Sequence, residues 1–268
     1  MTLTFSGTTI AAYAVSGAVM LIGGLAYMIG WKKRTGTKWF PIITGAVTFL
    51  LFALVLKSIP LYPILMAEND VSDTINNEIW LKAAVAGLSA GIFEETGRFL
   101  AFKTVLKKDP EKHTALDYGV GHGGIELLYA AVSTIGYVAI CIAVNQSGLE
   151  TFLADIPEMM QPDAIAKLED VAGHGFEILP LGLIERASAL MAHMGFSIMV
   201  FRAVRDKKSR WMYPAAIALH TAADIGAVLL AEHVLLLETV FFVFAAVILC
   251  VAVCKVYRRM PSVQEVRT

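Results

Sequence analysis

Four long apolar stretches of this sequence contain side chains that can carry charge or transfer protons. These side chains are Glu94, Glu95 and Arg98; His122 and Glu126; Glu185, Arg186 and His193; and His220 and Asp224. If the stretches span a membrane, each charged group near the bilayer centre costs about 2.5–3.5 kcal/mol on insertion scales. The total before pairing is on the order of 10–15 kcal/mol for five of these groups, Glu94, Glu95, Arg98, Glu126 and Asp224. A cost of this size is typical of residues that a function retains.

Helical spacing groups these side chains further, because residues four apart lie on one face of a helix. Three pairs have this spacing: Glu94 and Arg98, His122 and Glu126, and His220 and Asp224. In the membrane spans expected below, Glu94, Glu126, His193 and His220 fall near the middle of the membrane or toward its cytoplasmic half. We therefore expect the four segments to bring these residues into one polar cavity.

Glutamates and histidines in an apolar cavity suit the activation of water for attack on a carbonyl group. A carboxylate can accept the proton of water, while histidines or a bound divalent metal such as zinc polarise the carbonyl or bind the nucleophile. We expect one member of the Glu94–Glu95 pair to be the general base, with Arg98 orienting the pair. The candidate metal ligands are His193, His220 and Glu94.

The remaining candidates have supporting roles. Asp224 lies one helical turn beyond His220 and is expected to fix the tautomer of its imidazole, whereas His122 and Glu126 are expected to line the cavity. Each residue alone also has a structural explanation, since a Glu–Arg pair is often only a buried salt bridge and the glycines around His122 suit close helix packing. The combination on four segments is harder to explain by packing.

The elements that must position these residues are membrane helices. The chain of 268 residues is 57% hydrophobic and 17% charged, with a mean hydropathy of +0.65, against about 45–50% and about 25% in soluble domains. Apolar runs predict helices at about 9–30, 39–59, 80–105, 115–143, 181–203, 211–231 and 235–256. We therefore expect one all-α polytopic membrane domain over residues 1–268, with about seven transmembrane helices and the catalytic helices at about 80–231. No basic patch with interleaved aromatic residues suggests nucleic-acid binding.

The placement of lysine and arginine predicts the orientation of the chain. Basic residues cluster after the first, third, fifth and seventh predicted spans, with Lys57 and Lys82 near span ends, whereas the long loop at about 146–180 is acidic and is expected to carry one short helix near residues 163–171. The positive-inside rule then places the N-terminus and this loop outside and the C-terminus in the cytoplasm. This pattern suits a multi-pass protein of the plasma membrane.

Four motifs resemble a known family. They are Phe93-Glu94-Glu95-Thr96-Gly97-Arg98; Gly121-His122-Gly123-Gly124-Ile125-Glu126 with Tyr129; His193; and His220-Thr221-Ala222-Ala223-Asp224. In this order they resemble the intramembrane proteases related to the CAAX-prenyl endopeptidase and the PrsW proteases, and most closely the bacterial YhfC group of intramembrane metalloproteases. The resemblance implies a glutamate–histidine hydrolase that cleaves membrane proteins or peptides at membrane depth.

The resemblance has departures and leaves alternatives open. The prenyl endopeptidase pattern has one more residue between the glutamate pair and the arginine, and often has Asn where Asp224 stands, so a prenylated substrate is not expected. A relative of this superfamily, the Aph-type subunit of gamma-secretase, is a scaffold, so a non-catalytic scaffold or immunity-type protein is one alternative. A proton-coupled transporter is another, because Glu, Asp and His at mid-membrane depth also suit proton transfer.

Overall fold

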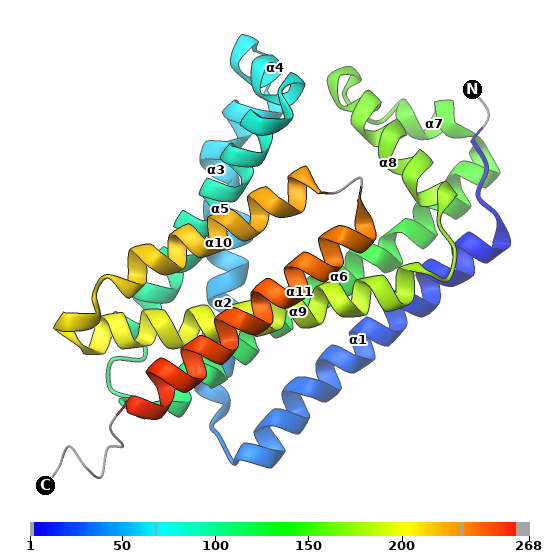
Figure 1. Cartoon of the computed structure of the whole chain (residues 1–268). Helices are drawn as coiled ribbons and strands as arrows, with labels where there is room; N and C mark the ends of the chain where they lie inside the picture. Colours follow the sequence, from blue (N-terminus) through cyan, green and yellow to red (C-terminus); the bar gives the residue numbers. More distant parts are fainter. Residues whose placement is uncertain (1–2, 68, 231–232, 261–268) are drawn as a thin grey trace, which may run out of the picture. The chain divides into compact units, whose positions relative to one another are not determined.

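The computed structural model describes residues 3–67, 69–230 and 233–260, and within them it contains helices and no β-strand (Figure 1). The long α-helices are α1 (Gly7–Thr35), α5 (Ile79–Lys103), α6 (His113–Ser147), α9 (Ile178–Arg205), α10 (Met212–Leu229) and α11 (Val234–Val251). The shorter ones are α2 (Trp39–Phe49), α3 (Ser58–Leu61), α4 (Asp70–Asn77), α7 (Leu149–Leu153) and α8 (Gln161–Gly173). Further short helical segments are η1 (Leu50–Leu56), η2 (Tyr62–Met66), η3 (Glu158–Met160), η4 (Lys207–Ser209), η5 (Ala252–Val256) and η6 (Tyr257–Arg259).

Among the described residues, six helical segments are long and apolar enough to cross a membrane: Gly7–Thr35, Trp39–Met66, His113–Ser147, Ile178–Arg205, Lys207–Leu229 and Thr239–Arg259. The protein is therefore an all-α polytopic membrane protein, as predicted. The other predicted span corresponds to α5, whose 25 residues are long enough to cross about 30 Å of hydrocarbon but include the charged Glu94, Glu95 and Arg98. The orientation of the termini stays a prediction, and residue 231, the predicted end of the sixth span, lies outside the described residues.

The second span is longer than the sequence predicted. The prediction ended it near residue 59, but the helical segment continues from Trp39 to Met66 through the two π-helical segments η1 and η2. Proline rings at positions 60 and 63 remove backbone donors and favour such interruptions of regular α-helical bonding. The N–H of Lys57 bonds to the carbonyl of Phe52, five residues earlier, at 3.1 Å. Lys57 therefore lies well inside the span, and its predicted place near a span end is wrong.

The predicted long loop at about 146–180 contains more helix than expected. The single short helix predicted near residues 163–171 is α8, which begins at Gln161 and ends at Gly173. Two further short elements, α7 and η3, precede α8. The sequence signal for them was weak because each is five residues or fewer.

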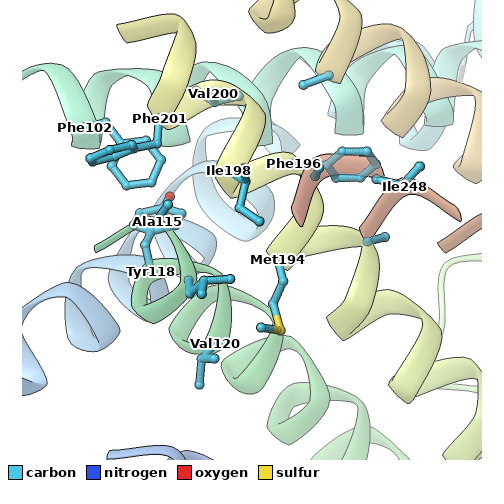
Figure 2. Packing of buried hydrophobic residues seen from close by; sticks show 14 of the residues in the cluster. Phe102, Ala115, Tyr118, Val120, Met194, Phe196, Ile198, Val200, Phe201 and Ile248 are labelled. Carbon is cyan, nitrogen blue, oxygen red and sulfur yellow. The ribbon is translucent and has the colours of Figure 1, made fainter. Parts of the chain in front are cut away.

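The chain divides into two compact units. The first contains residues 1–26 and 127–184, and the second contains residues 27–126 and 185–268. The expectation of a single membrane domain stays a prediction. Each unit has its own core: in the first, Tyr13, Val144 and Val171 are buried together. In the second, Figure 2 shows Phe102, Tyr118, Phe196 and Ile198 among the buried apolar side chains. All ten charged or histidine residues singled out in the sequence belong to the second unit.

Glycines bring the helices of the second unit into close contact. α5 and α10 pack together (Figure 1), and a Cβ atom at Gly91 of α5 would lie 2.8 Å from the carbonyl oxygen of Ile217 in α10. A Cβ atom at Gly119 of α6 would lie 2.9 Å from the Cα of Met194 in α9, and one at Gly121 would clash with the backbone of Ile42 in α2. Small residues permit such backbone approach in membrane helices. As a result, the glutamate, arginine and histidine side chains of the site can reach one another from α5, α6, α9 and α10.

Candidate active site

The site residues are buried at the centre of the second unit. Relative exposure is 0% for Glu95, Arg98 and His122, and 5% for Glu94, His193 and His220. α5 contributes Glu94, Glu95 and Arg98, and α6, α9 and α10 contribute one histidine each. The structure thus brings together residues that are up to 126 positions apart in the sequence, between Glu94 and His220. Buried charges of this kind require partners, because an unpaired charge inside a protein is very costly.

Arg98 and Glu95 form the innermost ion pair. The guanidinium of Arg98 bonds to both carboxylate oxygens of Glu95, one turn earlier on α5, and its second amino group lies 3.0 Å from Nδ1 of His193. Helical spacing had suggested Glu94 as the residue that shares a face with Arg98, but the structure pairs Arg98 with Glu95. An arginine has only donors, so it holds Nδ1 of His193 as an acceptor.

Glu95 also fixes the ring of His220. Oε1 of Glu95 lies 2.8 Å from Nδ1 of His220, and a carboxylate can only accept, so Nδ1 carries the hydrogen. The sequence had suggested Asp224 for this task. Oδ2 of Asp224 lies 3.8 Å from Nε2 of His220, beyond hydrogen-bond distance, and its side chain is 36% exposed. Glu95 therefore makes the contact that was expected of Asp224.

Glu94 is the less tightly bound of the two buried carboxylates of the cluster. Its Oε2 lies 3.2 Å from Nε2 of His122 and 3.9 Å from Nε2 of His220. Its Oε1 lies 3.7 Å from Nζ of Lys57, which directly follows the π-helical segment η1 of the second span. The sequence analysis did not place Lys57 at the site, because it put this lysine near the end of a span. The apolar run that continues past Lys57 to Met66 was the signal that could have placed it inside the membrane.

Glu126 forms the outer edge of the cluster. Its Oε1 lies 3.1 Å from Arg186, and its Oε2 lies 2.6 Å from Nε2 of His193 in a contact that is not aligned as a hydrogen bond. Arg186 also forms an ion pair with Glu185, its neighbour on α9. The side chains of Glu126 and Arg186 are 20% and 15% exposed, more than the inner residues. His193 thus has Arg98 on one nitrogen and Glu126 beside the other.

The cluster contains donors suited to a divalent cation. One atom each from Glu94, His122 and His193 lies within 4.8 Å of the others, and all three residues are buried. Carboxylate and imidazole are common ligands of zinc and related metals. In addition, Nδ1 of His122 is buried without a hydrogen-bond partner among the described residues. The residues present therefore fit a metal of this class.

Distance and hydrogen bonding select different third ligands. By distance, His193 joins Glu94 and His122. However, a neutral His193 that accepts from Arg98 at Nδ1 carries its hydrogen on Nε2, so neither nitrogen has a free lone pair. His220 is outside the 4.8 Å group, but its Nδ1–H donates to Glu95 and leaves Nε2 free, which is the arrangement usual for metal-binding histidines. Hydrogen bonding therefore favours His220 as the third ligand, because a nitrogen that carries a hydrogen cannot bind a metal. By the same rule His122 has only Nδ1 free, since its Nε2 lies 3.2 Å from the carboxylate of Glu94 and carries the hydrogen.

The fold and the cluster together define a class: polytopic membrane proteins with a buried group of glutamates and histidines. The chain belongs to the YhfC intramembrane metalloprotease family, whose sequence model matches residues 18–248. It is similar to the uncharacterized membrane protein YhfC of Bacillus subtilis (strain 168), with 28% identity over 240 residues that cover 87% of this chain and 91% of the relative. No solved structure matches the chain. The family that the four motifs suggested is thus confirmed, and the wider relation to the CAAX-prenyl endopeptidase and PrsW proteases stays a prediction.

Proposed function

We propose that this protein is an intramembrane peptidase that hydrolyses peptide bonds of membrane proteins or peptides. The observation that carries the proposal is the buried convergence of Glu94, His122 and His193 within 4.8 Å. The name of the family supports the same activity. Buried carboxylates beside imidazoles supply the general base and the polar groups that peptide hydrolysis needs.

Glu94 is the carboxylate that accepts the proton of water. Both oxygens of Glu95 are bonded to Arg98, and one of them also contacts His220, so Glu95 orients its neighbours instead. Among the described residues Glu94 forms no ion pair with an arginine, and its nearest polar partners are the imidazoles of His122 and His220 and the ammonium of Lys57. A weakly paired carboxylate is better able to accept a proton than one held in a tight ion pair.

Glu94, His122 and His220 would hold a divalent cation such as zinc, with Oε2 of Glu94, which faces the two imidazoles, as the ligand atom and Oε1 left to accept the proton of water. A cation bound there would polarise the substrate carbonyl and make bound water a stronger nucleophile. His193, whose nitrogens contact Arg98 and Glu126, is a positioning residue that links α5 to α6 and α9. Arg98 holds Glu95, and Glu95 in turn holds the ring of His220 in the tautomer that leaves Nε2 free.

The test combines turnover with metal content. The full chain, purified in detergent, is assayed for cleavage of membrane-spanning peptides, and its metal is measured by inductively coupled plasma mass spectrometry. Glu94→Gln keeps the shape of the side chain and removes proton acceptance, so turnover should fall about 10²-fold or more. Asp117→Asn is the matched control, because Asp117 is also a buried carboxylate of a membrane helix but bonds to Trp31 and Thr37. It should keep turnover.

Metal content separates the two ligand sets. His122→Gln and His220→Gln should each lose bound metal, whereas His193→Gln should keep most of it. The opposite result for His193 and His220 would show that distance, and not hydrogen bonding, chooses the third ligand. If Glu94→Gln and Glu95→Gln both cleave peptides at the parent rate, the peptidase proposal is wrong. A non-catalytic scaffold or a proton-coupled transporter would then take its place.

We further propose that the protein lies in the bacterial plasma membrane with its C-terminus in the cytoplasm. This orientation is supported by the excess of lysine and arginine after alternate spans, because cytoplasmic loops of membrane proteins are enriched in these residues. A fluorescent reporter fused after residue 268 should be active, and alkaline phosphatase inserted near Asp155 should also be active, because the first folds inside the cell and the second outside. Inactive reporters at both positions would reverse the orientation.

A further inference from the structure

A cavity whose lining contains none of the residues of the glutamate–histidine cluster lies where α5 ends and α10 begins. Its volume is about 410 Å³, and its lining residues are Phe99, Lys103, Ala203, Val204, Arg210 and Tyr213. This volume is within the range of sites that bind small ligands, about 300–1,000 Å³. All six residues belong to the second unit. The cavity is therefore large enough to bind a small ligand, and none of the residues proposed for hydrolysis line it.

Two cations line this cavity without a carboxylate partner. Among the described residues Lys103 forms no ion pair, and its Nζ lies 5.3 Å from the centre of the Phe99 ring. Arg210 likewise forms no ion pair with any residue that the structure describes. Nearby arginines differ in this respect: Arg202 pairs with Asp206 at 2.8 Å, and Arg205 donates to the carbonyl of Leu106 at 2.8 Å. Lys103 and Arg210 are thus the cations of the cavity that remain available for an external anion.

The rest of the lining is largely apolar and is held by contacts between its own side chains. The rings of Phe99 and Tyr213 lie 4.7 Å apart, and the hydroxyl of Tyr213 shares a hydrogen bond of 2.8 Å with Thr96. Asp206 holds the turn that carries Arg210, because its carboxylate accepts from the hydroxyl of Ser209 at 2.8 Å. A ligand for such a site combines an anionic group with an apolar portion.

The position of the cavity identifies the source of this ligand. Lys103 is the last residue of α5, and Arg210 lies in the first residues of the span Lys207–Leu229. The ends of membrane-spanning segments lie at the depth of lipid headgroups, about 15 Å from the bilayer centre. Basic pockets between helices at this depth suit anionic lipid headgroups. We propose that this cavity binds the phosphate group of an anionic membrane lipid, with Lys103 and Arg210 contacting the phosphate and Phe99, Val204 and Tyr213 contacting the glycerol and upper acyl chain.

The test measures lipid binding to the full chain in neutral detergent. Native mass spectrometry and thermal melts are recorded with phosphatidylglycerol, with phosphatidylcholine and with inorganic phosphate. The double variant Lys103→Gln/Arg210→Gln should bind phosphatidylglycerol at least tenfold more weakly than the parent. Lys107→Gln/Lys207→Gln is the matched control, because it removes two exposed lysines that do not line the cavity. Its affinity should stay within about twofold of the parent.

The outcomes separate the possible sources of phosphate. Stabilisation by phosphatidylglycerol, and not by phosphatidylcholine or inorganic phosphate, supports the proposal. Equal stabilisation by inorganic phosphate would assign the site to a soluble phosphate and overturn the lipid assignment. Equal loss of affinity in both double variants would overturn the site itself, because surface charge would then explain the binding. If the cavity double variant does not fold, Val204→Trp fills the cavity while it keeps both cations, and parent-like lipid affinity in that variant would also overturn the proposal.

Discussion

The pair of Glu95 and Arg98 gives the most direct test of how the cluster is held together. Both side chains are 0% exposed, and Arg98→Met removes the charge while it keeps much of the apolar length. Removal of one partner from a buried pair costs about 3–5 kcal/mol, because the other charge stays buried and uncompensated. For a chain of this size each kcal/mol corresponds to about 2–4 °C. We therefore expect the melting temperature in detergent to fall by about 6–20 °C.

A double-mutant cycle shows whether the loss comes from the pair. Arg98→Met/Glu95→Gln removes both charges, so it should melt at a higher temperature than Arg98→Met alone, with a coupling free energy of up to about 3 kcal/mol. Lys167→Gln is the control, since the pair of Lys167 and Asp170 is 53% and 47% exposed and such pairs contribute about 0–1 kcal/mol. If Arg98→Met melts within a few degrees of Lys167→Gln, the buried pair does not stabilise the protein and this reasoning fails.

Three further predictions concern single positions. Lys57→Met removes the cation 3.7 Å from Glu94, so zinc affinity measured by chelator competition should rise about tenfold, because a unit charge at this distance is worth about 1–4 kcal/mol at effective dielectric constants of about 80 to 20; unchanged affinity would show that Lys57 does not act on Glu94. Gly121→Ala should lower the melting temperature through overpacking worth about 1–3 kcal/mol, whereas Gly136→Ala on the same helix has no atom within 4 Å and should not; equal melting temperatures would refute the packing argument. The hydroxyl of Ser209 lowers the pKa of the Asp206 carboxyl, so this group stabilises the fold above its ordinary pKa of about 3.9 and the stabilisation is lost as the pH falls through the lowered pKa. Asp206→Asn should therefore melt below the parent at pH 7 and converge with it in acid, and a difference that persists in acid would exclude the carboxylate.

Most of the fold could be predicted because hydropathy and length decide it. Apolar runs of about 20 residues must become helices in a bilayer, whose lipid cannot satisfy backbone polar groups, and the described helices follow those runs. The end of the second span was not predicted correctly. The prediction ended this span near residue 59, next to Lys57 and the two prolines, but π-helical turns let the helix pass them and continue through the rest of the apolar run to Met66. The apolar run extends to Met66 in the sequence, but hydropathy alone does not show whether a helix continues past two prolines, because that depends on which backbone hydrogen bonds are exchanged.

The members of the cluster other than Lys57 could also be predicted, but their pairing could not. Spacing of four residues suggested that Glu94 faces Arg98 and that Asp224 faces His220. In the structure Glu95 takes both partners. Spacing describes one helix at a time, whereas the partner of a side chain here depends on contacts between α5, α9 and α10. The glycines that set these contacts were visible in the sequence, but the helices that they join were not.

The pairing gives a reason why a cation would bind at Glu94 in particular. Glu95 is compensated by Arg98, and Glu126 is compensated by Arg186 at 3.1 Å, whereas the nearest cation to Glu94 is Lys57 at 3.7 Å. The cluster and its edge contain five carboxylates, those of Glu94, Glu95, Glu126, Glu185 and Asp224, and three cations, those of Lys57, Arg98 and Arg186. With all five carboxylates ionised and the histidines neutral, a formal charge of −2 remains. A divalent cation would offset this charge, and Glu94 is where the compensation is weakest. Because an uncompensated charge is most costly where water is excluded, metal binding at Glu94 would also stabilise the surrounding helices.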